Sequence, residues 1–159
     1  MKIYTESELK NKAEAYCVRT ERCPEEVAQK LEQWGATEEE NARILAMLQQ
    51  DRFIDTCRYC KAFVRDKYRF ARWGRNKIIQ ALRMKHLPSD DISAGLAEID
   101  DEEYSRILRE VLAQKRKSVT GKTEYERAMK LLRYAVTKGY TVDEIKRYVH
   151  QVSEDEFMD

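Results

Sequence analysis

The side chains with the clearest chemical potential are the arginines and lysines between residues 52 and 85. This stretch holds eleven positive residues against Asp55 and Asp66, a net charge of +9. The planar guanidinium of Arg donates two parallel hydrogen bonds, a geometry that suits phosphate and carboxylate alike. The stretch therefore predicts an anionic partner, and it leaves open whether that partner is a nucleic acid or an acidic protein surface.

Some of these residues recur at helical spacing. Arg58, Arg65, Arg69 and Arg72 are separated by seven, four and three positions, which predicts one side of a long helix from about residue 57 to 70. A second basic cluster lies beside a loop nearer the C-terminus. The predicted partner or nucleic-acid contacts are Arg58, Arg65, Arg69, Arg72, Trp73, Arg75, Lys77, Lys115, Arg116, Lys117 and Lys122.

Trp73 admits two interpretations. It can close the gap between two helices, as a large apolar side chain usually does, and we favour this interpretation. It can also stack on a base or form an interface hot spot. Gly74, which follows it, predicts a turn.

Residue patterns typical of catalysis or metal binding are weak in this chain. Its two histidines, His86 and His150, belong to no recognisable nucleophile arrangement, and its five glycines occur singly rather than in a phosphate-binding loop. The carboxylate runs at 38–40 and 100–103 fall at predicted helix starts, where they favour the helix dipole. We therefore expect no catalytic residue, no metal and no cofactor.

The four cysteines are best interpreted as reduced thiols. Cys57 and Cys60 lie within a predicted helix, and the spacing of Cys17 and Cys23 is not a common zinc-knuckle spacing. No apolar run is long enough for a membrane span, and the first ten residues lack the apolar region of a signal peptide. A cytoplasmic protein with no membrane association is expected.

The elements that must position the basic residues are predicted to be helices throughout. Charged residues make up 37% of the chain, with only five Gly and two Pro, a composition typical of a helical protein with a solvated surface. Local signals agree: Thr5 begins a capping box, Pro24 suits a first helical position, and Thr37, Ser89 and Thr141 suit N-caps.

The helices are predicted to form three tandem three-helix repeats. Gly35, His86 and Gly139 each end the second helix of a repeat, and they are separated by 51 and 53 residues. Two apolar or small residues precede each stop by eight and four positions: Val27 and Leu31, Ile78 and Leu82, Leu131 and Ala135. We expect repeat 1 at 1–50, repeat 2 at 51–101, repeat 3 at 102–152 and an acidic tail at 153–159. Short linkers, at 49–52 and 100–103, predict an elongated and curved row.

At these positions the sequence resembles the RecX family, regulators of the RecA recombinase. The resemblance covers roughly residues 13 to 150 and is most specific in the second repeat. It rests on Phe53-Ile54-Asp55, Arg58-Tyr59, Ala62-Phe63-Val64-Arg65-Asp66-Lys67, Arg72-Trp73-Gly74-Arg75 and Ile78, followed by Tyr125-Glu126-Arg127 and Lys138-Gly139-Tyr140-Thr141.

The resemblance implies an all-α fold of three tandem repeats, which agrees with the periodicity. It also implies a protein that binds in the groove of the RecA filament on single-stranded DNA, and we expect this protein to be a monomer and not an enzyme. Such a protein limits strand exchange and coprotease activity in recombination, repair and the SOS response. We expect the basic faces of repeats 2 and 3 to enter the groove and to contact acidic side chains and, weakly, DNA.

A helix-turn-helix DNA-binding regulator is the alternative, because three-helix units resemble such modules. The third helices of the first two repeats argue against it. They are expected at about 37–48 and 89–99, where the side chains are acidic or apolar. Phosphates would repel the acidic ones in a major groove.

Overall fold

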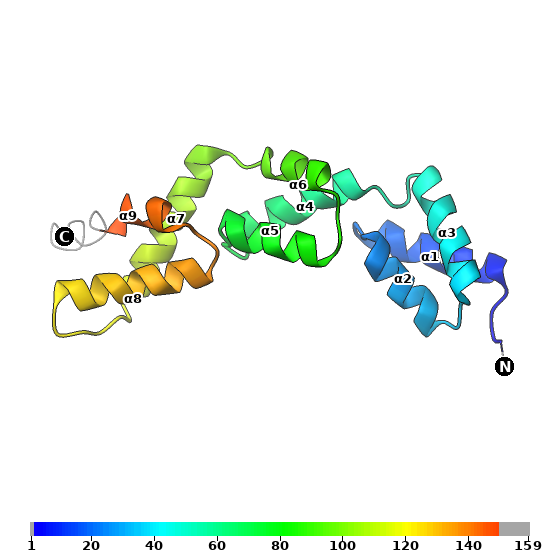
Figure 1. Cartoon of the computed structure of the whole chain (residues 1–159), viewed down its shortest axis with the longest axis horizontal. Helices are drawn as coiled ribbons and strands as arrows, with labels where there is room; N and C mark the ends of the chain where they lie inside the picture. Colours follow the sequence, from blue (N-terminus) through cyan, green and yellow to red (C-terminus); the bar gives the residue numbers. More distant parts are fainter. Residues whose placement is uncertain (1, 150–159) are drawn as a thin grey trace. The chain divides into compact units, whose positions relative to one another are not determined.

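The computed structural model describes residues 2–149, and in this part of the chain every regular element is a helix (Figure 1). Residues 1 and 150–159, which include His150 and the predicted tail at 153–159, lie outside the described residues. The all-α prediction is confirmed. The helices are α1 (Glu6–Arg19), α2 (Pro24–Gln33), α3 (Glu38–Gln50), α4 (Thr56–Arg69), α5 (Arg75–Met84), α6 (Ser89–Leu96), α7 (Asp101–Arg116), α8 (Glu124–Thr137) and α9 (Val142–Lys146).

The helix starts follow the local signals in the sequence. Thr5, Thr37 and Thr141 each form a full capping box, in which the Thr hydroxyl accepts an N–H three residues on and a Glu carboxylate accepts the Thr N–H. Pro24 is the first residue of α2, where a missing N–H costs nothing. Asp55 accepts the N–H of Arg58 at 3.0 Å and so caps α4.

Two local predictions were wrong. Ser89 is the first residue of α6 and not its cap, because the carbonyl of Pro88 accepts the first helical bond from Ile92 at 3.0 Å. The linkers also lie elsewhere than expected: α3 continues to Gln50 and α7 begins at Asp101, so the connections are residues 51–55 and 97–100.

The repeated stop after each second helix has one backbone conformation. Gly35, His86 and Gly139 have φ of 93°, 60° and 104°, the left-handed region that favours glycine. His86 therefore occupies a position where its two counterparts are glycines. This shared conformation supports the repeat alignment that the sequence predicts.

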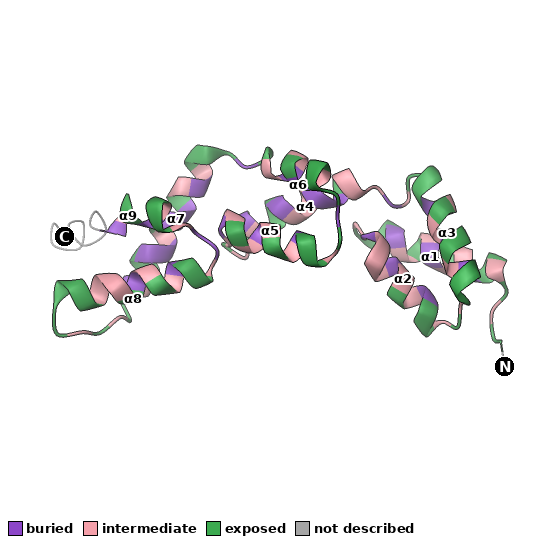
Figure 2. Cartoon of the chain, viewed as in Figure 1, coloured by how far each residue is buried: buried purple, intermediate pink, exposed green. Residues whose placement is uncertain are grey.

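The described residues group into two compact units, and both draw on α4 and α5. Within the described residues, the first unit comprises residues 2–62 and 82–95, and the second comprises 63–81 and 96–149. In the first, α1, α2 and α3 pack against one another. Their buried residues form a core together with Ile54 (Figure 2): Leu9, Ala13, Cys17, Val27, Leu31, Ile44, Leu48.

In the second unit α8 packs against both α7 and α9. Helix α7 buries an apolar face, which comprises Tyr104, Ile107, Leu108, Val111 and Leu112. Leu131 and Ala135 of α8 and Ile145 of α9 are buried as well.

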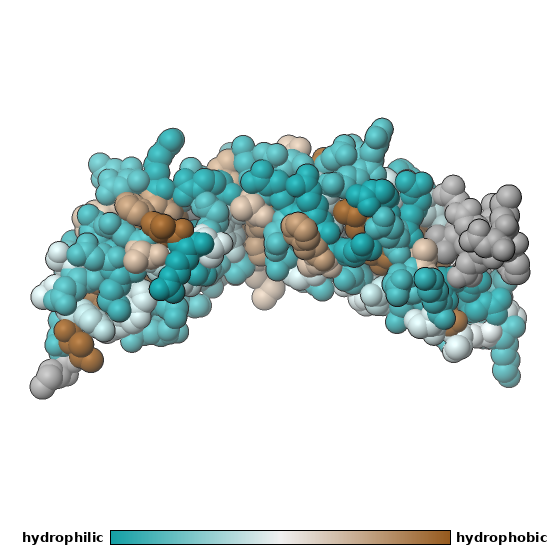
Figure 3. Space-filling view, turned by 180° about the vertical axis from the view of Figure 1, so that it is seen from behind, coloured by the Kyte–Doolittle hydropathy of each residue, from teal (hydrophilic) through white to brown (hydrophobic). Residues whose placement is uncertain are grey.

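The outer surface matches the charged composition. On the face drawn in Figure 3 hydrophilic residues predominate and apolar groups form small separate patches. No helix among residues 2–149 has the length and apolar character to cross a membrane. The division into repeats 1–50, 51–101 and 102–152 stays a prediction.

Candidate functional site

The turn between α4 and α5 carries the most specific sequence motif, Arg72-Trp73-Gly74-Arg75. Trp73 lies half-buried with its ring edge-on to Phe63, the ring centroids 6.3 Å apart. The ammonium groups of Lys67 and Lys77 lie 4.9 and 4.5 Å from the Trp73 ring centroid. These contacts support the packing interpretation of Trp73, and they hold Lys77 by a cation–π interaction.

Gly74 brings this turn into backbone contact with the turn between α8 and α9. The Gly74 N–H donates to the carbonyl of Lys138 at 2.8 Å, and the Asn76 N–H donates to the carbonyl of Gly139 at 3.0 Å. A Cβ on Gly74 would lie 2.2 Å from the backbone carbon of Gly139, so only glycine fits. The motif glycine therefore joins two turns that are far apart in the sequence.

Arg75 fastens the same junction through its side chain. Its Nη2 lies 2.7 Å from Asp101 and its Nη1 lies 3.1 Å from Glu144. The guanidinium also lies over the Tyr104 ring, 4.1 Å from its centroid. The Tyr104 hydroxyl accepts the backbone N–H of Arg75 at 3.0 Å.

Other predicted contact arginines also pair within the chain. In the first unit Arg58 binds Glu21, with Nε 2.6 Å from Oε2, and this hydrogen bond raises the pKa of the guanidinium. In the second unit the Nε of Arg69 donates to Glu103 at 2.9 Å. That carboxylate has a lowered pKa, because the Tyr68 hydroxyl and Arg69 both donate to it. These arginines are half-exposed, so pairing does not hide them.

Arg72 does not share the helix face predicted for it. Helix α4 ends at Arg69, and Arg72 follows in a left-handed conformation with φ of 59°. Its Nη2 lies 3.1 Å from Glu110. The spacing of these arginines places Arg72 on the shared face only in a helix that continues through residue 72, and α4 ends three residues earlier.

The remaining predicted contacts differ in exposure. Arg65 is exposed on α4 and makes no ion pair with the residues that the structure describes. Lys122 is exposed in the loop before α8, whereas Arg116 is buried at the end of α7. The structure thus separates Arg116 from its neighbours Lys115 and Lys117, which lie nearer the surface. The contact role of all eleven residues stays a prediction.

A basic pocket of about 320 Å³ brings part of the predicted set together. Its charged lining comprises Arg72, Lys115, Lys117 and Lys138, and Val111 and Tyr134 supply apolar lining. The Lys115 ammonium lies 4.6 Å from the Tyr134 ring centroid. No carboxylate lines the pocket, although Glu110 pairs with Arg72 nearby.

Lys138 is the basic pocket residue that the predicted contacts do not include. Its Nζ donates to the carbonyl of Ala71 at 3.0 Å, which fixes the side chain beside the α4–α5 turn. Burial lowers the pKa of Lys138, and the charges of Lys77 and Arg72 lower it further. Lys138 stands directly before the helix stop Gly139, and its approach to Arg72 depends on contacts that the local sequence does not reveal.

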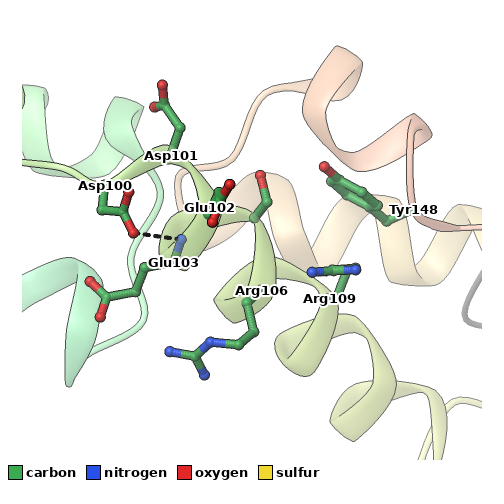
Figure 4. Close-up of a pocket in the computed structure, with 8 residues that line it drawn as sticks. Asp100, Asp101, Glu102, Glu103, Arg106, Arg109 and Tyr148 are labelled. Carbon is green, nitrogen blue, oxygen red and sulfur yellow. Dashed lines mark hydrogen bonds between the residues drawn. The ribbon is translucent and has the colours of Figure 1, made fainter.

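A second, acidic pocket of about 720 Å³ surrounds the start of α7. Figure 4 shows its lining residues, with Asp100 accepting the N–H of Glu103. This carboxylate caps α7, and Asp101 and Glu103 pair with Arg75 and Arg69. These carboxylates therefore have structural partners already.

The thiols have no metal-site geometry in the described part of the chain. No group of three or more His, Cys, Asp or Glu residues there is placed to hold a metal ion. Cys17, Cys23 and Cys60 are buried and Cys57 is half-buried. Burial raises the pKa of Cys60 to about 12, so this thiol stays protonated at neutral pH.

Comparison with known proteins matches the chain to one family. Residues 57–96 match the family model of the RecX second three-helix domain. The regulatory protein RecX of Clostridium botulinum strain Alaska E43 is 35% identical over 145 residues, covering 89% of this chain and 66% of the relative. The regulatory protein RecX of Clostridium perfringens strain SM101 is 29% identical and covers 94% and 71%. The chain thus spans about two thirds of the length of these relatives.

Solved structures share the fold. A crystal structure of regulatory protein RecX superposes with a TM-score of 0.79 at 22% identity, covering 89% of this chain and 73% of the other. The crystal structure of RecX from Lactobacillus salivarius gives 0.78 at 20% identity and covers 93% and 96%. The predicted family resemblance is confirmed, and the chain belongs to the RecX family of regulatory proteins.

Proposed function

We propose that this chain is a non-enzymatic, cytoplasmic regulator of the RecA recombinase, acting as a monomer. It binds in the groove of the RecA filament on single-stranded DNA and lowers the activity of that filament in recombination, repair and the SOS response. Family membership is the observation that carries the proposal, because relatives matching nearly the whole chain are regulatory proteins of this family.

The distribution of charge supports a groove-facing role for repeats 2 and 3. Residues 52–85 carry +9 and residues 105–150 carry +7, separated by a −7 segment at 86–104. Several of the predicted contact arginines are tied to carboxylates, and within the predicted set Arg65, Lys117 and Lys122 are exposed cations without an ion pair in the described structure. Among the predicted contacts, these three are the most available to an anionic partner.

Helix-turn-helix reading of duplex DNA is less well supported. Helix α3 has Glu38, Glu39 and Glu40 in its first turn, and α6 has Asp90 and Asp91. In helix-turn-helix proteins the recognition helix, which corresponds to the third helix of a three-helix unit, contacts base edges with its N-terminal residues, close to the phosphates. Carboxylates at that end would be repelled.

Cosedimentation with RecA filaments assembled on single-stranded DNA tests the proposal, together with RecA ATPase and strand-exchange assays. The wild-type chain should pellet with the filaments at moderate salt and lower both activities. A chain that stays in the supernatant would refute filament binding. A chain that pellets but leaves both activities unchanged would refute the negative role.

Charge reversal at Arg65 locates the interface. Arg65→Glu should weaken filament binding about tenfold, because it replaces attraction by repulsion without breaking an internal ion pair. Arg19→Glu is the matched control, since Arg19 is exposed on α1 in repeat 1. Equal losses from the two variants would contradict an interface on repeats 2 and 3. Arg75→Glu is a poor probe, since it would face Glu144 and Asp101.

A further inference from the structure

The basic pocket between the α4–α5 turn and helices α7 and α8 is built, rather than formed by chance proximity of surface lysines. Lys138 is held by the Ala71 carbonyl, and Lys115 lies against the Tyr134 ring. The Ser118 hydroxyl donates to the Lys115 carbonyl at 3.1 Å, which closes the end of α7 beside the pocket. The positions of these cations are therefore set by contacts in the second unit.

The pocket carries more positive charge than its neighbours neutralise. Arg72 pairs with Glu110, whereas Lys115, Lys117 and Lys138 have no ion pair among the described residues. Burial and the nearby charges of Lys77 and Arg72 lower the pKa of Lys138, as expected where like charges lie close together. A bound anion would relieve this repulsion.

The chemistry of the lining favours phosphate over carboxylate. A carboxylate offers two oxygens and one negative charge, and the carboxylate of Glu110 already pairs with Arg72. Three lysines are compact point charges that can each reach a different oxygen of a tetrahedral phosphate. Gln114 and Ser118 add neutral hydrogen-bonding groups to the lining.

We infer that the pocket lined by Arg72, Lys115, Lys117 and Lys138 binds a phosphate ester, the group carried by nucleic-acid strands and free nucleotides. The inference deepens the proposed function and relies on it for a biological role, but it can be tested without the recombinase.

The experiment measures binding of a fluorescent 20-nucleotide oligothymidylate to the whole chain by anisotropy across a salt series. Lys117→Gln should weaken binding about three- to tenfold at low salt and should reduce the slope of log K against log salt by about 0.7. Lys146→Gln is the matched control, because it removes the same charge from an exposed position on α9 that is outside the pocket and outside the predicted contacts. It should change affinity less than twofold.

Two further arms decide the source of the phosphate and guard against misfolding. Titration with thymidine monophosphate tests whether a free nucleotide binds. Saturable binding of this nucleotide to the wild-type chain, lost in Lys117→Gln, would support a phosphate site in the pocket even if the oligonucleotide does not bind. Lys138→Gln should also weaken binding, and circular dichroism checks its fold because Lys138 holds Ala71. Equal effects of Lys117→Gln and Lys146→Gln, or failure of both phosphate probes to bind, would overturn the inference. Because RecA is absent, these outcomes are independent of filament regulation.

Discussion

The two compact units join their three-helix elements in different ways. In the first unit the contacts are made by side chains: Glu26 accepts the Tyr59 hydroxyl at 2.7 Å and lies 3.5 Å from the Lys85 ammonium, and Arg58 binds Glu21. In the second unit side-chain pairs such as Arg75–Glu144 are accompanied by a direct backbone contact, where Gly74 approaches Gly139 too closely for any side chain. Similar helices can thus be joined by exchangeable polar pairs or by a fixed steric fit.

The difference predicts unequal tolerance to substitution. Polar pairs at a partly exposed surface contribute little each and can be lost singly. A backbone contact with no room for a Cβ cannot adjust without moving both turns. The second unit, which carries the basic pocket and the specific motif, should be the less tolerant of the two.

The largest expected effect is that of Gly74→Ala. The new Cβ would lie 2.2 Å from the Gly139 carbon and 2.3 Å from the Tyr140 nitrogen, both backbone atoms. The junction would have to open, which should lower the free energy of unfolding by about 3 kcal/mol or more. Urea unfolding monitored by circular dichroism measures the loss.

Gly35→Ala is the control for Gly74→Ala. Gly35 has φ of 93°, but a methyl group added there would meet no atom within 4 Å, so the cost is conformational strain alone. We expect a loss of about 1 kcal/mol. Equal losses at Gly35 and Gly74 would show that the backbone junction of the second unit is not specially constrained.

Arg75→Ala should have the next largest effect. It removes an ion pair with Glu144, whose side chain is only 18% exposed, together with the contact over Tyr104. The expected loss in the free energy of unfolding is about 1–2 kcal/mol. The comparison variant is Arg58→Ala, whose side chain is 44% exposed and whose partner is Glu21. An Arg58→Ala loss equal to that of Arg75→Ala would contradict the proposed difference between the units.

Glu26→Gln tests the polar junction of the first unit. The amide keeps a hydrogen-bond acceptor for the Tyr59 hydroxyl but loses the charge that faces Arg22 and Lys85. Charged acceptors form stronger hydrogen bonds than neutral ones, so the loss should be about 1 kcal/mol and should shrink at high salt. Unfolding in low and high salt measures this dependence. A loss that does not change with salt would indicate packing rather than charge.

Local chemistry made most of the fold predictable from the sequence. The long helix expected at 57–70 is found at Thr56–Arg69, and the stops at Gly35, His86 and Gly139 share one conformation. Capping residues and apolar spacing act over a few positions, so these features can be read without knowing the tertiary contacts.

The candidate site was less predictable because its partners are distant in sequence. Arg75 meets Glu144 across 69 residues, and Gly74 meets Gly139 across 65, pairings that no local pattern indicates. The sequence shows which segments are basic. It does not show that Arg69 and Arg75 form ion pairs with carboxylates, or that Lys138 and Arg72 line the same pocket. The motif that identified the family proves, in Gly74 and Arg75, to hold the second unit together.

The smallest expected effect is a gain in stability, from His86→Gly in the first unit. His86 has φ of 60°, a conformation that costs a residue with a Cβ about 1 kcal/mol. Glycine avoids this strain, but its greater conformational freedom stabilises the unfolded chain and offsets part of the gain. The ring meets Glu25 at 3.0 Å but is 84% exposed, so that contact contributes little. We expect a net gain of about 0.5 kcal/mol in the free energy of unfolding, measured against wild type in matched urea titrations.

Gly139→Ala, the related change in the second unit, should instead be strongly destabilising, because its Cβ would lie 2.5 Å from that of Lys77. A clear loss on His86→Gly would mean that the Glu25 contact is integral to the first junction, and the contrast between a tolerant and a rigid unit would fail at this position.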